Sequence, residues 1–219
     1  MAGREQFENE LNEVKQKVIA LLKASQEQLN RSVKALYASD IDESKQLIED
    51  DKALDELDLA INESAILLIA KQQPVATDLR KLIAAIRLAT DIERMADNAK
   101  NIARSAIHLG PDHHLTIDPR LTDMAKIANA MIDLAIEAYN EEDIHKAKQL
   151  SDEDDKIDEL FGKVLKDMLS NSANRSVEIQ LIMQVAFCAR YIERFGDHLT
   201  NVAENIMYLV KGETFDLNR

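Results

Sequence analysis

The sequence predicts an all-α protein of six long helices, and three observations support this prediction. Of 219 residues, only 5 are Gly and 3 are Pro, whereas a domain of average composition would contain roughly 25 of these helix and strand breakers. Aromatic residues make up 4% of the chain and Trp is absent, which leaves little material for the aromatic and β-branched surfaces of sheets. Apolar residues also recur at steps of three and four, the period of an amphipathic helix.

The few breakers and polar clusters divide the chain into six helical stretches. A soft break near Asp40 ends the first stretch, and Pro74 ends the second. Residues 110–119 separate the third from the fourth, a second soft break lies near Asn140, and the polar residues 171–175 separate the fifth from the sixth. The predicted helices span 5–38, 41–72, 75–108, 119–140, 142–170 and 176–211.

The third and sixth predicted helices each carry a narrow apolar seam, which is typical of antiparallel bundle packing. The seam of the third consists of Ala85, Leu88, Ala89, Ile92, Met95, Ala96, Ala99, Ile102, Ala103 and Ala106. The seam of the sixth consists of Val185, Cys188, Ala189, Ile192, Phe195, Gly196, Leu199, Val202, Ala203 and Ile206. Because the single cysteine, Cys188, lies on a seam, we interpret it as a core residue and not as a metal ligand.

An internal repeat organises the chain. With a shift of 103 residues, Ala38–Leu57 aligns with Glu141–Leu160 at 9 of 20 positions. A shift of 100 aligns Ile92-Glu93-Arg94 with Ile192-Glu193-Arg194 and continues with further identities. The sequence therefore predicts two tandem, pseudo-repeated three-helix bundles of antiparallel helices: a first repeat at 1–110, a connection at 111–118 and a second repeat at 119–219.

The repeated positions include four pairs of carboxylates. The members of each pair are four residues apart and so lie on one face of a helix, where like charges repel each other. The pairs are Asp51–Asp55 and Glu93–Asp97 in the first repeat, and Asp154–Asp158 and Glu193–Asp197 in the second. Asp55 precedes Pro74 by 19 residues and Glu93 follows it by 19, so an antiparallel hairpin would bring both pairs of a repeat to a similar height. We expect four carboxylates to converge on the bundle surface in each repeat.

Two interpretations of these carboxylates compete. A solvated acidic face is common in a chain with 40 acidic residues, but it would not require the same register twice. Clustered oxygen ligands suit iron, manganese, magnesium or calcium, with zinc as a further candidate. A buried ferritin-like di-iron centre is disfavoured, since it needs two ExxH motifs and the chain has one, Glu142–His145.

Composition and motifs exclude several classes of function. With 27 Lys and Arg against 40 Asp and Glu, the net charge is -13, which repels nucleic-acid phosphates and predicts no direct nucleic-acid binding. The longest apolar run, Ala65–Ala70, is too short to span a membrane and residues 4–15 are densely charged, so we expect a cytoplasmic protein that is at most peripheral to membranes. No nucleophile elbow, P-loop or GxGxxG motif occurs, and we do not expect an enzyme.

The paired carboxylates and their surroundings resemble the PhoU family of bacterial phosphate-signalling proteins. The resemblance covers essentially the whole chain and is strongest in the stretches IERMADNAKNIA and IERFGDHLTNVAENIMYLVKGE. It implies a cytoplasmic regulator of phosphate uptake that acts with the ATPase subunit of a Pst-type phosphate ABC transporter and with a PhoR-type sensor histidine kinase. Such a protein keeps the phosphate-starvation response off when phosphate is plentiful.

The resemblance also implies a metal site and self-association. Family members bind iron or zinc clusters through the paired acidic motifs and commonly form homodimers or larger oligomers. This role carries over to all eight carboxylates, with Asn101 and Asn201 as weaker, outer candidates, while magnesium or manganese remain alternatives. Two other hypotheses stay open: a ferritin-like or phosphohydrolase-type metalloenzyme that uses the same carboxylates, and a plain helical interaction module.

Overall fold

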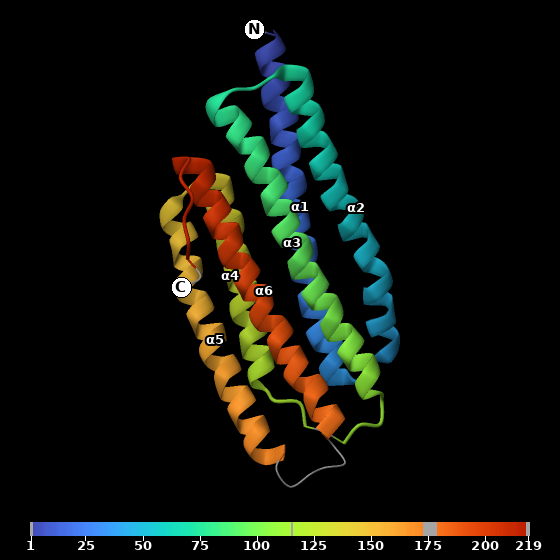
Figure 1. Cartoon of the computed structure of the whole chain (residues 1–219). Helices are drawn as coiled ribbons and strands as arrows, with labels where there is room; N and C mark the ends of the chain where they lie inside the picture. Colours follow the sequence, from blue (N-terminus) through green and yellow to red (C-terminus); the bar gives the residue numbers. More distant parts are fainter. Residues whose placement is uncertain (1, 115, 173–178, 218–219) are drawn as a thin grey trace.

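A computed structural model of the chain describes residues 2–114, 116–172 and 179–217, and these fold into six helices with no strand among them (Figure 1). The all-α class predicted from the sequence is therefore confirmed. The helices are α1 (Ala2–Ala38), α2 (Ile41–Gln72), α3 (Ala76–Leu109), α4 (Arg120–Glu141), α5 (Ile144–Ser172) and α6 (Ile179–Lys211).

The helix boundaries lie within three residues of their predicted positions where the structure describes both, and the start of α5 shows how a difference of two residues arises. Glu142 adopts a left-handed conformation with φ 52°, and the Asp143 carboxylate accepts a hydrogen bond of 2.7 Å from the backbone N–H of His145. The helix therefore begins two residues after its predicted start at 142, because a left-handed residue and a capping aspartate precede it. The predicted start of the sixth helix, at 176, and part of the break at 171–175 lie outside the described residues.

The same arrangement precedes α2, which explains one of the repeated identities. Ser39 has φ 52°, equal to that of its repeat partner Glu142, and Asp40 accepts a hydrogen bond of 3.0 Å from the backbone N–H of Glu43. The match between Asp40 and Asp143 is thus structural: each side chain satisfies backbone donors that a helix start leaves without partners.

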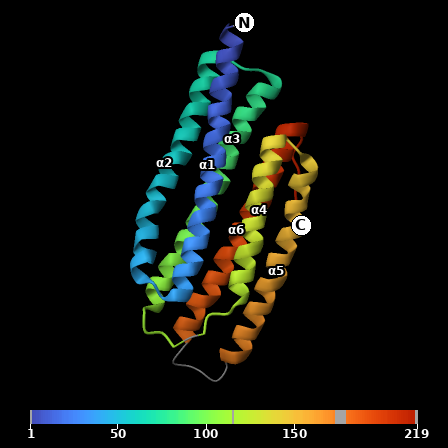
Figure 2. The ribbon, with the colours of Figure 1, turned by 180° about the vertical axis from the view of Figure 1, so that it is seen from behind.

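The helices pack as two neighbouring three-helix groups, α1–α3 and α4–α6, with α3 and α6 against each other along much of their length (Figures 1 and 2). One continuous apolar core runs through both groups. The predicted seams line this contact: Ile92 and Ile192 are fully buried, and so is Cys188. The division at residues 110 and 119 stays a prediction based on the repeat.

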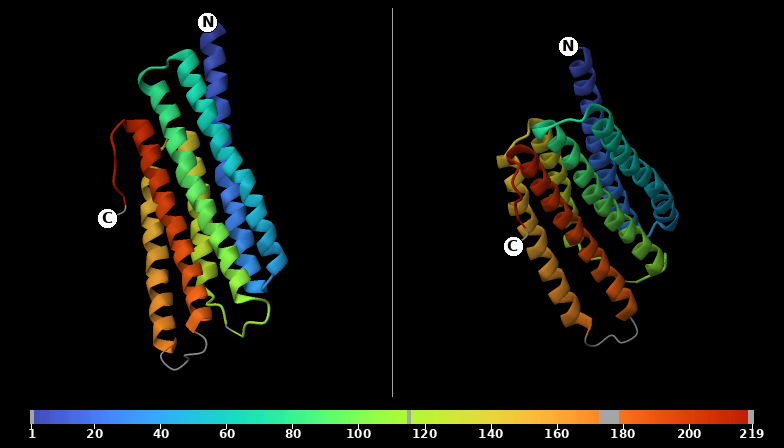
Figure 3. Two further views of the ribbon diagram at one scale, coloured as in Figure 1. Left: turned by 45° about the vertical axis from the view of Figure 1, so that its right-hand side comes forward. Right: turned by 45° about the horizontal axis from the view of Figure 1, so that its top comes forward.

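The chain folds back after α6, and the segment after Lys211 runs along the outside of the bundle (Figure 3). The backbone N–H of Leu217 donates a hydrogen bond of 2.7 Å to Glu204, and Ser151 on α5 donates one of 3.2 Å to the Leu217 carbonyl. Within the described ranges, no helix combines the length and apolarity needed to cross a membrane.

Candidate metal centre

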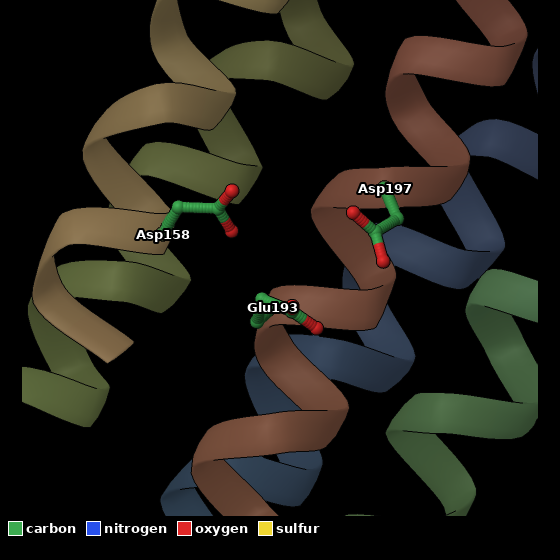
Figure 4. A group of neighbouring side chains, drawn as sticks. All are labelled: Asp158, Glu193 and Asp197. Carbon is green, nitrogen blue, oxygen red and sulfur yellow. The ribbon is translucent and has the colours of Figure 1, made fainter. Parts of the chain in front are cut away.

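Asp154, Asp158, Glu193 and Asp197, here called the second cluster, lie where α5 packs against α6. One carboxylate oxygen from each of Asp158, Glu193 and Asp197 lies within 4.8 Å of the other two. Asp158 extends from α5 toward α6, on which Glu193 and Asp197 lie one turn apart (Figure 4). No second group of three acidic, His or Cys side chains reaches this distance in the described part of the chain.

Two members of the second cluster are deeply buried and lack partners for one oxygen each. Asp154 and Glu193 are each 7% exposed. Asp154 Oδ1 and Glu193 Oε2 have no hydrogen-bond partner among the described residues. A buried carboxylate oxygen without a donor is costly, so both atoms are in an environment that favours a cation.

Gly196 provides the space for one of these oxygens. A Cβ atom at Gly196 would overlap Asp154 Oδ1 and approach Ile157 Cδ1 to 3.2 Å. The carboxylate therefore packs directly against the backbone of α6, a position that a side chain would block. Because it has no side chain, Gly196 leaves the room that Asp154 occupies in the second cluster.

The pKa values of the second cluster reflect the burial and close spacing of its carboxylates. Burial, together with the charges of Asp158, Asp197 and Glu193, raises the pKa of Asp154 to about 7. Burial and the Asp197 carboxylate likewise raise the pKa of Glu193 to about 7. Without a counter-ion, crowded carboxylates retain protons that isolated ones would lose.

One protein cation reaches the second cluster from its edge. Arg190 Nη1 donates a hydrogen bond to Glu193 Oε1, and the Arg190 side chain is 47% exposed. This contact neutralises part of the charge and leaves Glu193 Oε2 free to bind a cation. The donor set then consists of hard carboxylate oxygens, which suits the cations expected from the sequence.

Asp51, Asp55, Glu93 and Asp97, here called the first cluster, have different partners. Lys100 lies between two of them: its ammonium contacts Asp51 Oδ2 and lies 2.5 Å from Asp97 Oδ1. The other Asp51 oxygen accepts a hydrogen bond of 2.9 Å from Gln28. Both oxygens of this buried carboxylate are thus satisfied by the chain itself.

The other two members of the first cluster lie farther out. Burial and the Asp51 charge raise the pKa of Asp55, while burial and the Asp97 charge raise that of Glu93. Asp55 is exposed and Glu93 partly so. The carboxylates of this cluster influence one another electrostatically without converging as Asp158, Glu193 and Asp197 do.

The expectation that the carboxylates lie toward the surface was wrong for three of the eight. Asp51 is 4% exposed, and Asp154 and Glu193 are each 7% exposed. The spacing within a helix places the two carboxylates of a pair on one face, but it does not show how deeply that face is covered where α2 packs against α3 and α5 against α6. The outer candidates have other partners: Asn101 accepts a hydrogen bond from Arg104, and Asn201 donates one of 3.2 Å to Asp91 on α3.

Sequence reasoning missed the roles of three residues that shape the two clusters: Gln28, Lys100 and Gly196. Lys100 and Gly196 left a signal in the sequence as mismatches of the repeat beside the matched carboxylates: Lys100 aligns with Thr200, and Gly196 aligns with Ala96. The contribution of Gln28 requires the packing of α1 against α2, which the repeat does not reveal.

An all-helical chain with repeated carboxylate pairs on adjoining helices defines a class of duplicated, acidic helical-bundle proteins. The family model of the PhoU domain matches this chain in two segments, residues 18–106 and 121–206. The chain belongs to the PhoU domain family, as its resemblance to that family implied.

Full-length relatives and a solved structure agree with this assignment. The phosphate-specific transport system accessory protein PhoU homolog of Clostridium acetobutylicum is 31% identical, over 98% of this chain and 99% of that protein. The Escherichia coli accessory protein PhoU is 30% identical, over 96% of this chain and 87% of that protein. The crystal structure of the phosphate transport system regulatory protein PhoU from Streptococcus pneumoniae aligns with a TM-score of 0.89 at 26% identity, over 96% of this chain and 99% of that one.

Proposed function

We propose that this chain is an accessory regulator of a phosphate-specific transport system. The observation that carries the proposal is the full-length likeness to the relatives from C. acetobutylicum and E. coli, which are named as accessory proteins of a phosphate-specific transport system. In the proposed role, the protein acts in the cytoplasm as a homodimeric or larger adaptor between the ATPase subunit of a phosphate ABC transporter and a PhoR-type sensor kinase. It restrains uptake and the starvation response when phosphate is plentiful.

The proposed adaptor carries metal at the second cluster. Asp158, Glu193 and Asp197 would bind iron or zinc, with Asp154 behind them against Gly196. The metal would neutralise carboxylates that otherwise repel one another, and it would present a fixed, charged surface to partner proteins. The unsatisfied buried oxygens of Asp154 and Glu193 support this assignment.

Replacing both Glu193 and Asp197 by alanine is expected to abolish metal binding without unfolding the protein. The double variant removes two of the three converging oxygens and relieves their mutual repulsion. Elemental analysis of tag-free protein measures the metal content, and circular dichroism measures the fold. As a matched control, Glu153→Ala/Lys156→Ala changes an exposed pair on α5 and should leave the metal content unaltered. Equal metal content in the wild type and the Glu193/Asp197 variant would contradict the assigned site.

The regulatory role is tested with the same variants in cells. Pull-down from phosphate-replete cells should recover the transporter ATPase and the sensor kinase with the wild type, and less of both with the Glu193/Asp197 double variant. A starvation-response reporter should stay off with the wild type and rise when the chain is deleted. Failure to recover either membrane partner, with no change in the reporter upon deletion, would refute the adaptor role.

A metalloenzyme remains the alternative function, because pKa values of about 7 at Asp154 and Glu193 also suit a general acid or base. This hypothesis predicts that metal-loaded protein oxidises Fe²⁺ or hydrolyses phosphate esters at a rate that depends on Glu193. Metal-loaded protein with neither activity would count against the alternative and leave the adaptor proposal standing.

A further inference from the structure

The two clusters occupy equivalent places in the repeat, but the chain gives them different surroundings. Lys100, whose side chain is 13% exposed and which contacts Asp51 and Asp97, aligns with Thr200 in the second repeat. Thr200 is buried and its hydroxyl donates a hydrogen bond of 2.7 Å to the backbone carbonyl of Asp197. The second cluster therefore has no ammonium at this position.

Two further differences between the repeats also distinguish the first cluster from the second. Extending the shift of 103 into the first helix of each repeat aligns Gln28, the donor to Asp51, with Met131, which is buried and apolar. Ala96 has a methyl group at the position of Gly196, where such a group would displace Asp154. The first repeat thus has a cation, an amide donor and a methyl group where the second has a hydroxyl, a thioether and a glycine against which Asp154 packs.

We infer that the duplicated site has diverged, so that metal binds only at the second cluster while Lys100 takes the place of the metal at the first. This inference rests on the proposed metal site and assigns a role to each half of the repeat. The ammonium of Lys100 supplies the positive charge that holds Asp51 and Asp97 together. The first cluster then has a permanent counter-charge at Asp51 and Asp97, and only the second responds to metal supply.

The energetic reason is competition for the same space and charge. A divalent ion at the first cluster would have to separate Lys100 from Asp51 and Asp97. The displaced ammonium is tethered to α3 and mostly buried, so it would stay close to the ion and repel it. The remaining carboxylate oxygens of Asp55 and Glu93 do not converge with Asp97, and they offer no ready substitute site.

The test measures metal stoichiometry at both clusters. Chelator-treated, tag-free protein is titrated with Zn²⁺ alone in equilibrium dialysis, and bound zinc is counted by elemental analysis. We expect Glu193→Ala/Asp197→Ala to lose the wild-type zinc and Glu93→Ala/Asp97→Ala to retain it. Lys100→Thr should roughly double the bound zinc, because it frees Asp51 and Asp97 from the ammonium that pairs with them. Ala96→Gly added to Lys100→Thr should increase the affinity of the new site.

Controls separate removal of this particular ammonium from a general change in charge. Lys126→Thr removes an exposed lysine that pairs with Asp123 and should leave the zinc stoichiometry unchanged. The reciprocal variant Thr200→Lys should reduce the bound zinc to background if it folds, as judged by circular dichroism.

Two results would overturn the inference and leave the proposed function intact: a loss of about half of the wild-type zinc in Glu93→Ala/Asp97→Ala, or a Lys100→Thr protein that folds and gains no zinc. If wild-type protein binds no zinc, the proposed metal binding at the second cluster is refuted instead. In that case zinc binding by Lys100→Thr alone would still support the role of Lys100, and its absence would refute that role.

Discussion

Replacing Gly196 by alanine is expected to lower the affinity for Zn²⁺ by about 10- to 100-fold, the range usual for residues that position metal ligands. The added methyl group would overlap Asp154 Oδ1 and crowd Ile157. The Asp154 carboxylate must then move away from α6, out of the position from which it supports Glu193 and Asp197. Isothermal titration with Zn²⁺ measures the change in affinity.

Because of helix propensity, Gly196→Ala should affect zinc affinity and helix stability in opposite directions, so the two effects can be told apart. An alanine in a helix interior is normally more stable than glycine by about 1 kcal/mol, so the variant is expected to keep its helices. Gly162 provides the matched control, because it lies within α5 and a Cβ atom there would meet no atom within 4 Å. Gly162→Ala should raise thermal stability and leave zinc affinity unchanged. Equal zinc affinity in Gly196→Ala and the wild type would show that Asp154 plays no part in the site.

The sequence was sufficient to predict the fold because each helix is specified locally. Breakers such as Pro74 and the segment at 110–119 lie between elements, and the seam residues Ile92 and Ile192 are buried as their period indicated. The start of α5 differs from its prediction because Glu142 is left-handed, and a single left-handed residue leaves no periodic signal.

The site was less predictable because it depends on pairs of helices. The repeat identified all eight carboxylates by register. The position of a residue on its own helix, however, does not show whether neighbouring helices bury it, as they do Asp51 and Glu193. Matching positions were also given more weight than mismatches. Lys100 and Gly196, which make the clusters different, are mismatches and so carried no weight.

Asparagine in place of Asp154 and in place of Asp51 should have opposite effects on the stability of metal-free protein at pH 8. Asp154→Asn removes a buried charge that repels Asp158, Asp197 and Glu193, and we expect a gain on the order of 2 kcal/mol in the free energy of unfolding. Asp51→Asn removes the main partner of buried Lys100, and we expect a loss of about 3 kcal/mol. Urea denaturation in the presence of a chelator measures both, with unchanged m values as the check on two-state unfolding.

The pH dependence of stability identifies why Asp154→Asn should stabilise the metal-free protein. Its pKa is raised from an ordinary 3.8 to about 7 in the folded protein, and that of Glu193 from 4.5 to about 7. Between these limits the folded state binds more protons than the unfolded state, so the stability of metal-free protein falls as pH rises and levels off above about 7. The advantage of Asp154→Asn should therefore be present at pH 8 and largely absent at pH 4.5, where Asp154 is protonated.

Bound zinc should reverse the sign of the stability change for Asp154→Asn, but not for Asp51→Asn. In zinc-loaded protein the carboxylate offsets the ion's charge, so Asp154→Asn becomes destabilising, whereas the loss in Asp51→Asn stays the same because Lys100 is covalently part of the chain. A pH-independent gain in Asp154→Asn would mean that packing, and not charge, governs its effect. Equal losses in the two variants, with and without zinc, would mean that the two clusters are electrostatically alike.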